Sequence, residues 1–304
     1  MVTGYLHPDY AHSMAEFGTP RRLPRSGGWI LQRSVAGSAY HDCMGCYPLF
    51  CCQDWRQLDQ DLEDIGDDLV SLSLVTDPFG DYHVDYLRRC FPDVSRPFKK
   101  HLVVELNRPL NTFVSGHHRR NARKALQAVQ IEQCPAPIQF LDDWVALYST
   151  LIRRHGIEGI RAFSRQAFEM QLQVPGLVAF RAVHRGLTIG MLLWYMQGEV
   201  AYYHLGAYST TGYQLRSSFA LFWRAIEYFG NQGGVQWLNL GAGAGTSDAS
   251  GDGLSRFKRG WATGTRTSYF CGRILDQEKY AKLTSAYPRP SHAYFPAYRT
   301  GEFA

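Results

Sequence analysis

The chain has 304 residues, of which 45% are hydrophobic and 19% are charged. Its 18 Tyr, 17 Phe and 7 Trp residues exclude a disordered chain, which carries few aromatic side chains. A chain of about 300 residues can bury one large core or two ordinary ones. The formal net charge of +5 suits an anionic ligand such as a coenzyme phosphate or RNA, but does not require one.

Targeting and membrane signals are the next features. Residues 1–28 contain several Pro and Arg residues and no apolar core of a signal peptide. No uninterrupted apolar run approaches the roughly 20 residues that cross a bilayer. Seven Cys residues, an odd number, favour reduced thiols over a disulfide framework. We therefore expect a cytoplasmic protein without integral membrane association.

The first third of the chain predicts an arm, a helix and two strands. Residues 1–35 are rich in Gly, Pro and basic residues, so we expect a flexible basic arm. Apolar side chains recur at steps of three and four within residues 53–68, which indicates an amphipathic helix with Asp54 as its N-cap. Residues 69–75 and 101–106 are apolar and predict buried strands.

Helices dominate the middle of the chain. Residues 117–129 predict one helix, which is closed by the prolines that follow. Residues 138–152 carry a single apolar stripe and predict a second helix. A shorter helix is expected over residues 164–172, with Ser164 as its cap.

The periodicity then changes to that of strands. Residues 177–184, 187–196 and 200–207 are three apolar runs joined by loops of two or three residues. Loops this short join antiparallel neighbours, so these strands are predicted to form a meander.

Residues 214–230 predict a long helix with Gly residues at its end, and residues 235–240 a further strand. A Gly-rich loop is expected over residues 241–253, a short helix over residues 254–261 and a last strand over residues 267–275.

This order of elements resembles the GNAT acyltransferase fold, and three stretches resemble its FemAB-like branch, which includes the Fem-type peptidyltransferases. The stretches are the basic segment 117–125, the segment 202–207 with Gly212 and Tyr213, and the segment 239–241 with residues 252–254 and 257–261. The resemblance implies an α/β (α+β) fold, with a GNAT-like mixed sheet flanked by helices and two tandem halves, the N-terminal one degenerate. It implies an arm at 1–35, the degenerate half at 36–116, the acyltransferase half at 117–285 and an aromatic tail at 286–304.

The loop after the third meander strand departs from the acetyl-CoA-binding pattern. That pattern, Gln/Arg-x-x-Gly-x-Gly/Ala, presents backbone N–H groups to the pyrophosphate. Residues 209–216 offer hydroxyl groups, one Gly and one Arg instead. Gly212, Tyr213 and Arg216 are the candidate donor-binding residues, although a first-turn Arg is commonly just solvent-exposed. The donor stays open between acyl-CoA and aminoacyl-tRNA.

Three residues are candidates for catalysis. The resemblance implies that Lys258 stabilises negative charge on the donor ester or the tetrahedral intermediate; the alternative is a solvated basic turn. Tyr203 and His204 are neighbours on a strand, so only one of them is expected to face the site. The Tyr suits a general acid and the His a general base, whereas a core Tyr and a hydrogen-bonded His are the alternatives.

Substrate contacts are expected from the basic segment. Arg119 and Arg123 are four residues apart, as are Arg120 and Lys124, so the members of each pair share a helix face. Such a face suits RNA phosphates or a nucleotide-linked substrate. A solvated face is the alternative. Asp252 is predicted either to orient Lys258 or to cap the helix that follows it.

Two other motifs are weak. The four Cys residues within residues 43–52 lie too close together for the two separated pairs of a structural zinc site, so we predict no metal. The Gly-x-Gly-x-Gly run at 241–245 lacks the remaining features of a dinucleotide fingerprint, and a mobile loop is the better interpretation.

The leading hypothesis is an N-acyltransferase that moves an acetyl or longer acyl group from acyl-CoA to a primary amine of a small molecule or peptide. One alternative is a Fem-like aminoacyltransferase that uses aminoacyl-tRNA; another is an inactive GNAT-like binding module. DNA is not an expected partner. The acceptor, the acyl chain length and the oligomeric state stay open.

Overall fold

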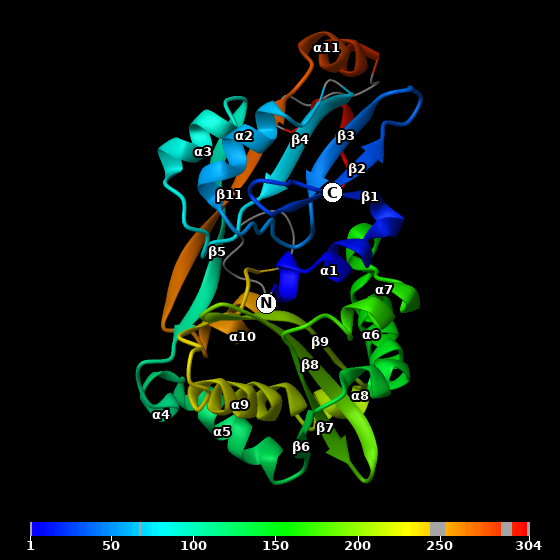
Figure 1. Ribbon diagram of the computed structural model, residues 1–304. Coiled ribbons are helices and arrows are strands. Elements are labelled where there is room, and N and C mark those ends of the chain that lie inside the picture. The colour runs from blue at the N-terminus through cyan, green and yellow to red at the C-terminus, as the bar shows by residue number, and fades with distance from the viewer. Residues whose placement is uncertain (1, 67, 244–252, 287–293, 303–304) are drawn as a thin grey trace. The chain divides into compact units, whose positions relative to one another are not determined.

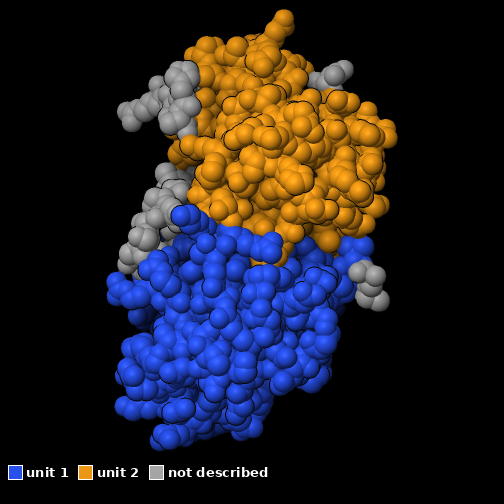
Figure 2. All heavy atoms as spheres, turned by 90° about the vertical axis from the view of Figure 1, so that its left-hand side faces the viewer, with its two compact units in different colours: residues 1–4, 100–266 blue, residues 5–99, 267–304 orange. Residues whose placement is uncertain are grey.

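The computed structural model describes residues 2–66, 68–243, 253–286 and 294–302. The chain divides into two compact units (Figure 2). Unit 1 contains Met1–Gly4 and Lys100–Arg266, and unit 2 contains Tyr5–Lys99 and Thr267–Ala304. The chain passes between the units within two strands, β5 (Val94–Glu105) and β11 (Gly264–Ile274).

Unit 1 contains a mixed sheet in the order β5-β10-β9-β8-β7-β6. Its further strands are β6 (Gln130–Cys134), β7 (Leu177–His184), β8 (Leu187–Gln197), β9 (Val200–Tyr208) and β10 (Trp237–Asn239). Strands β6 to β9 are antiparallel neighbours, which confirms the predicted meander and adds β6 at its edge. Strand β10 runs parallel to β9 and antiparallel to β5.

Helices cover both faces of this sheet (Figure 1). They are α4 (Leu110–Phe113), α5 (Gly116–Leu126), α6 (Leu141–His155), α7 (Arg165–Gln171), α8 (Thr210–Gln214), α9 (Ser217–Gly230) and α10 (Gly253–Arg259), with 3-10 turns η4 (Pro137–Phe140) and η5 (Gly159–Arg161). On β8, Trp194 contacts Phe222 of α9, whereas the hydroxyl of its neighbour Tyr195 donates to the Gln171 carbonyl of α7. Because successive strand residues face opposite sides, α9 and α7 lie on opposite faces.

The predicted helices of unit 1 are confirmed with one correction. Ser164 caps α7 as expected, since its hydroxyl accepts from the Ala167 N–H. The helix predicted over residues 214–230 is wrong at its start, because the chain forms two helices, α8 and α9. Arg216 separates them with a left-handed backbone, φ 57° and ψ 36°, which cannot continue a right-handed helix.

Unit 2 has its own sheet strands, in the order β1-β2-β3-β4-β11. Besides β11 they are β1 (Thr19–Arg22), β2 (Trp29–Ser34), β3 (His41–Gly45) and β4 (Leu69–Val75). The helices are α1 (Pro8–His12), α2 (Leu58–Glu63), α3 (Val84–Cys90) and α11 (Gln277–Ala286), with 3-10 turns η1 (Gly4–Leu6), η2 (Ala15–Phe17), η3 (Trp55–Gln57) and η6 (Ala297–Arg299). Asp54 caps η3 as predicted, because its carboxylate accepts from the Arg56 N–H.

Two expectations about the ends of the chain differ from the structure. The segment predicted to be a flexible arm contains β1 and β2 and contributes the buried side chains of Tyr10, Leu23 and Ile30. The last strand, which was expected in the acyltransferase half, belongs to unit 2 from Thr267 onward, and the tail belongs to unit 2 as well. Strand β11 pairs antiparallel with β4, with Phe270 opposite Val75. This pairing between distant strands, and not the position in the sequence, places most of β11 in unit 2.

The tail is bound to unit 2 through a buried carboxylate. Asp42 is fully buried and accepts from the Arg299 guanidinium and from the Tyr298 hydroxyl. The side chain of Arg33 is nearly buried and lies 3.3 Å from the same carboxylate. These contacts hold the tail against β2 and β3.

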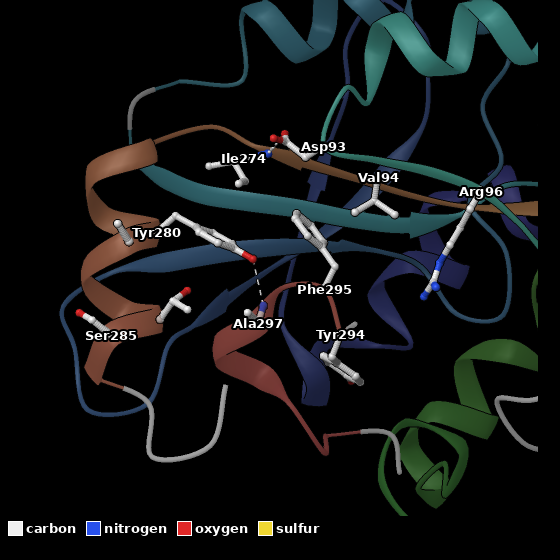
Figure 3. A pocket seen from close by; sticks show the side chains of 11 residues that line it. Asp93, Val94, Arg96, Ile274, Tyr280, Ser285, Tyr294, Phe295 and Ala297 are labelled. Atoms are coloured by element: carbon white, nitrogen blue, oxygen red, sulfur yellow. Dashed lines mark hydrogen bonds between the residues drawn. The ribbon is translucent and has the colours of Figure 1, made fainter. Parts of the chain in front are cut away.

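Unit 2 also contains a pocket of about 670 Å³ between α11, the tail and the ends of β5 and β11 (Figure 3). Two of its polar groups form hydrogen bonds within the fold, whereas the buried Thr284 hydroxyl has no hydrogen-bond partner among the described residues. Asp93 accepts from the Ile274 N–H at 2.7 Å, and the Tyr280 hydroxyl accepts from the Ala297 N–H at 3.0 Å. Tyr280 and Phe295 stack across it. We therefore assign this pocket to the attachment of the tail.

Candidate acyl-transfer site

Strands β9 and β10 diverge after a short ladder in unit 1. They are paired only from Trp237 opposite Val200 to Asn239 opposite Tyr202, although β9 continues to Tyr208. Beyond Asn239 the chain follows β5 instead, because the Leu240 N–H donates to the Leu102 carbonyl. The part of β9 after Tyr202 is therefore not paired with β10.

A β-bulge on β9 lies next to this divergence. Leu205 is opposite Leu193 and Tyr203 is opposite Trp194, so His204 is the extra residue between them. Bulges change the direction of side chains and are common beside active sites. The bulged residue His204 and its neighbour Tyr203 are the two residues that the sequence offers for proton transfer.

Tyr203 lies on the face of the sheet that α9 covers. Its ring packs 5.3 Å from the Trp194 ring and 5.0 Å from the Phe222 ring. Its hydroxyl lies over Gly206, where any Cβ would collide with it. Burial raises the pKa of the Tyr203 hydroxyl well above its ordinary value, although a hydrogen bond with Tyr208 lowers it in part. The phenol is therefore protonated at neutral pH.

Lys258 of α10 reaches the same face. It is 6% exposed, its Nζ donates to the Ala242 carbonyl at 2.7 Å, and this ammonium lies 5.5 Å from the centre of the Tyr203 ring. A Cβ on Gly241 would lie 3.1 Å from the Nζ, and Gly241 has a φ of +76°. The alternative of a solvated basic turn is wrong for Lys258, because its side chain is buried.

Asn239 and His101 support this turn, and sequence reasoning did not select them. The Asn239 side-chain oxygen accepts from the Gly241 N–H at 2.9 Å and lies 3.1 Å from His101 Nδ1. Both side chains are buried. Asn239 belongs to the Asn-Leu-Gly motif, but nothing in the motif reveals that His101, on distant β5, would bind it.

His204 lies on the opposite face from Tyr203 and Lys258. Its Nε2 is 3.2 Å from the Gln171 side-chain oxygen, and its ring packs 4.8 Å from the Tyr195 ring. Burial lowers its pKa to about 3. The expectation that only one of the two neighbours faces Lys258 is therefore met by Tyr203.

His118 ties the basic helix α5 to α10 and was also missed. Its Nε2 lies 2.8 Å from the Phe257 carbonyl, and its Nδ1 lies 2.9 Å from the Ser115 hydroxyl. Its ring occupies the space that a side chain at Gly260 would need. Burial lowers the pKa of His118. Helix α5 is therefore attached directly beside Lys258.

In the segment between β9 and α9, which includes α8, several amides donate within the protein. The Gly212 N–H donates to the Ser209 hydroxyl, the Tyr213 N–H to the Ser209 carbonyl and the Arg216 N–H to the Tyr213 carbonyl. The backbone at Gly212 also packs directly against the Ile189 carbonyl. This loop therefore differs from one whose amides are open to a pyrophosphate.

Arg216 and Arg123 are brought together, whereas Arg119 is not. A pocket of about 450 Å³ is lined by His117, Arg120, Asn121, Arg123, Lys124, Gln127 and Arg216. Arg119 turns away from it and donates to the Asn111 carbonyl. Arg119 therefore does not line this pocket with Arg123. Asp252 lies outside the described residues.

The Cys residues of unit 2 are buried free thiols. Burial raises the pKa of Cys43 and of Cys46 to about 12, which keeps both neutral near pH 7. Within the described ranges, no three His, Cys, Asp or Glu side chains are grouped to hold a metal ion. Nor does any described helix combine the length and apolar character that a bilayer crossing needs.

The chain is similar to known proteins mainly in its fold. Residues 115–259 match a family model described as an acetyltransferase (GNAT) domain. No curated protein sequence matches the chain. The solved structure of FemX has a TM-score of 0.65 and 13% identity, with 90% of this chain and 93% of that chain covered.

Two further solved structures are similar at full length. L-PGS from Bacillus licheniformis has a TM-score of 0.54 and 14% identity, with 93% of this chain and 97% of that chain covered. The C-terminal domain of a protein assigned as a lysylphosphatidylglycerol synthetase, from Agrobacterium fabrum, has a TM-score of 0.59 and 14% identity, with 91% and 90% covered. Residues 115–259 therefore resemble a GNAT acetyltransferase domain, and the chain shares the fold of FemX and of L-PGS over about nine-tenths of its length.

Proposed function

We propose that this protein is an aminoacyltransferase that moves an aminoacyl group from the ester of an aminoacyl-tRNA to a primary amine. The observation that carries the proposal is the buried ammonium of Lys258 beside the Tyr203 ring, where β9 and β10 diverge. An ammonium held in a site of low dielectric strongly stabilises an oxyanion that forms next to it.

The transfer needs one bond to form and one to break. The amine nitrogen attacks the ester carbonyl, and Lys258 stabilises the negative oxygen of the tetrahedral intermediate. The carbon–oxygen bond to the ribose then breaks, and the amide remains. Tyr203, which stays protonated because burial raises its pKa, donates a proton to the departing ribose oxygen and recovers one from the nitrogen of the attacking amine.

The loop before α9 favours an ester donor over a thioester of CoA. In a CoA site of the GNAT type, backbone amides hold the pyrophosphate. The amides of Gly212, Tyr213 and Arg216 already donate within the loop. The similarity in fold to FemX and to L-PGS supports the same choice of donor.

An acyl-CoA donor is the second candidate, because residues 115–259 match a family model for acetyltransferases. Under this alternative Lys258 and Tyr203 keep their roles, and a thiolate departs in place of the ribose oxygen. Binding of CoA would then require the loop before α9 to rearrange.

The deciding experiment measures transfer to a panel of amino acids, amino sugars and polyamines from labelled aminoacyl-tRNA and, separately, from labelled acetyl-CoA. Lys258→Met is the test variant and Lys100→Met, at an exposed position, is the control. We expect transfer from aminoacyl-tRNA only, reduced about 10²- to 10³-fold by Lys258→Met. Transfer from acetyl-CoA alone would show that the donor is acyl-CoA and not an aminoacyl ester. A wild-type rate in Lys258→Met would refute the catalytic role of Lys258.

A further inference from the structure

The pocket in unit 1 is lined by a row of cations, most of them on one helix. Arg120, Arg123 and Lys124 line it from α5, and Arg216 closes it from the start of α9. Across the described part of the chain, these four side chains form no ion pair with a carboxylate. Like charges at this spacing repel each other and destabilise the helix. An anion in the pocket would remove that repulsion.

Arg216 is held in place rather than left to move freely. Its Nη1 donates to the Asn121 side-chain oxygen at 2.5 Å, and Asn121 is only 6% exposed. The Asn121 amide nitrogen in turn donates to the His117 carbonyl at 2.9 Å. A guanidinium has five N–H donors, so this bond leaves others for a ligand. The left-handed backbone of Arg216, rare for a residue with a side chain, marks a constrained position.

The dimensions of the pocket favour a chain of phosphates. Its lining residues run from His117 to Gln127, a helical rise of about 15 Å. Three of the cations, Arg120, Arg123 and Lys124, occupy about 6 Å of this rise, and Arg216 adds a fourth from α9. A single carboxylate or diphosphate would contact only part of the row, whereas successive phosphates of a nucleic-acid strand would contact all of it.

Helix α5 connects this row to the transfer site. Its buried face carries His118, whose Nε2 lies 2.8 Å from the Phe257 carbonyl, and Phe257 directly precedes Lys258. The pocket lies on the other face of the same helix. A strand held by α5 would therefore have its position set by the same element that positions Lys258.

We infer that Arg120, Arg123, Lys124 and Arg216 form a binding site for the backbone phosphates of the RNA that carries the acyl group. The inference rests on the proposed function and adds the residues through which the donor is held. Arg119 is not part of this site, because it does not line the pocket, and its guanidinium donates to the Asn111 carbonyl instead.

The test measures binding without transfer. A fluorescein-labelled RNA hairpin with an unpaired 3′ end is titrated with the full-length protein at several salt concentrations, and binding is followed by anisotropy. The test variant is Arg120→Gln/Arg123→Gln, and Arg119→Gln on the same helix is the matched control. Melting temperatures of all variants confirm that each is folded.

We expect the double variant to bind the hairpin at least about tenfold more weakly than the wild type. The negative slope of log K against log salt should become less steep by about 1.5, because two phosphate contacts are lost. Arg119→Gln should bind as the wild type does. Arg123→Lys should keep most of the affinity, because a Lys ammonium also binds phosphate.

Equal losses in the double variant and in Arg119→Gln would overturn the inference, since a general surface charge would then account for binding. Unchanged RNA binding in the double variant would overturn the inference as well. So would a separate titration with CoA in which the double variant loses CoA binding but keeps RNA binding. The proposed function is judged separately by Lys258→Met, so transfer that depends on Lys258 but not on the pocket would refute the phosphate site alone.

Discussion

The ammonium of Lys258 lies 5.5 Å from the centre of the Tyr203 ring, and it donates to the Ala242 carbonyl at 2.7 Å. The ring face and the carbonyl both stabilise the charged form of a lysine that is almost fully buried. This arrangement places a fixed positive charge and a protonated phenol together. Under the proposed function, the charge would stabilise the oxyanion and the phenol would supply a proton to the leaving group.

Gly241→Ala tests the support of Lys258. Alanine at a left-handed position costs about 1–2 kcal/mol, and here its methyl group would also lie 3.1 Å from the Lys258 Nζ. We expect transfer to fall by about 10²-fold as the ammonium is displaced. Gly186→Ala is the matched control, because Gly186 has a φ of +77° and no atom within 4 Å of its Cβ position. Equal loss of stability with equal rates in the two variants would contradict the role of Gly241.

Tyr203→Phe removes the hydroxyl and keeps the ring under the Lys258 ammonium. We expect the rate of transfer to fall by about 10²-fold or more, with the melting temperature little changed, because a general acid is lost. Since burial raises the pKa of Tyr203, the wild-type rate should show no decline from its ionisation around neutral pH. Tyr228→Phe, whose hydroxyl accepts from Gln133, is the control. A full rate in Tyr203→Phe, measured across neutral pH, would exclude Tyr203 as the acid.

His204 should make the protein less stable in mild acid. Its pKa is about 3 in the folded protein and about 6.5 when unfolded, so between these values the unfolded chain binds the extra proton. The free energy of unfolding should fall as the pH drops below about 6.5, by up to about 1.4 kcal/mol per unit.

His204→Gln should remove this dependence, as measured by urea unfolding near pH 7 and pH 5. Exposed His155→Gln should leave it unchanged. Because His204 lies on the face away from Lys258, transfer by the folded His204→Gln variant should stay near the wild-type rate. Abolished transfer with unchanged stability would instead restore the catalytic role predicted from the sequence.

Asp42→Asn tests the attachment of the C-terminal tail to unit 2. Removing the charge leaves the guanidinium groups of Arg33 and Arg299 without their buried anion, which should cost about 3 kcal/mol. Asp85→Asn, in an exposed pair with Arg88, should cost less than about 1 kcal/mol. Urea unfolding compares the two, and similar small losses would show that the Asp42 network contributes little.

Local patterns in the sequence predicted much of the fold. The change from helical to alternating periodicity identifies the meander of β7, β8 and β9, because loops as short as Arg185-Gly186 allow only antiparallel neighbours. Ser164 and Asp54 were predicted as caps from residue type and position alone. The pairing of β11 with β4 was not predicted, since no local pattern records which distant strands meet.

For the candidate site too, local patterns predict one part and the tertiary structure decides the other. The Fem-like motifs select Lys258, and strand alternation shows that Tyr203 and His204 cannot both face it. Which of them does so depends on the bulge on β9 and on the helices that cover each face. The bulge is a mismatch between two strands, so it does not exist in either strand alone.

The sequence by itself determined the residue types available for chemistry, the order of the elements and the cationic character of α5. Only the tertiary structure decided that Arg120 rather than Arg119 joins Arg123 and Arg216, and that Asn239 and His101 support the turn at Gly241. The physical reason is that helical and strand periodicities follow from neighbouring residues, whereas burial, pKa values and long-range hydrogen bonds depend on which distant elements pack together.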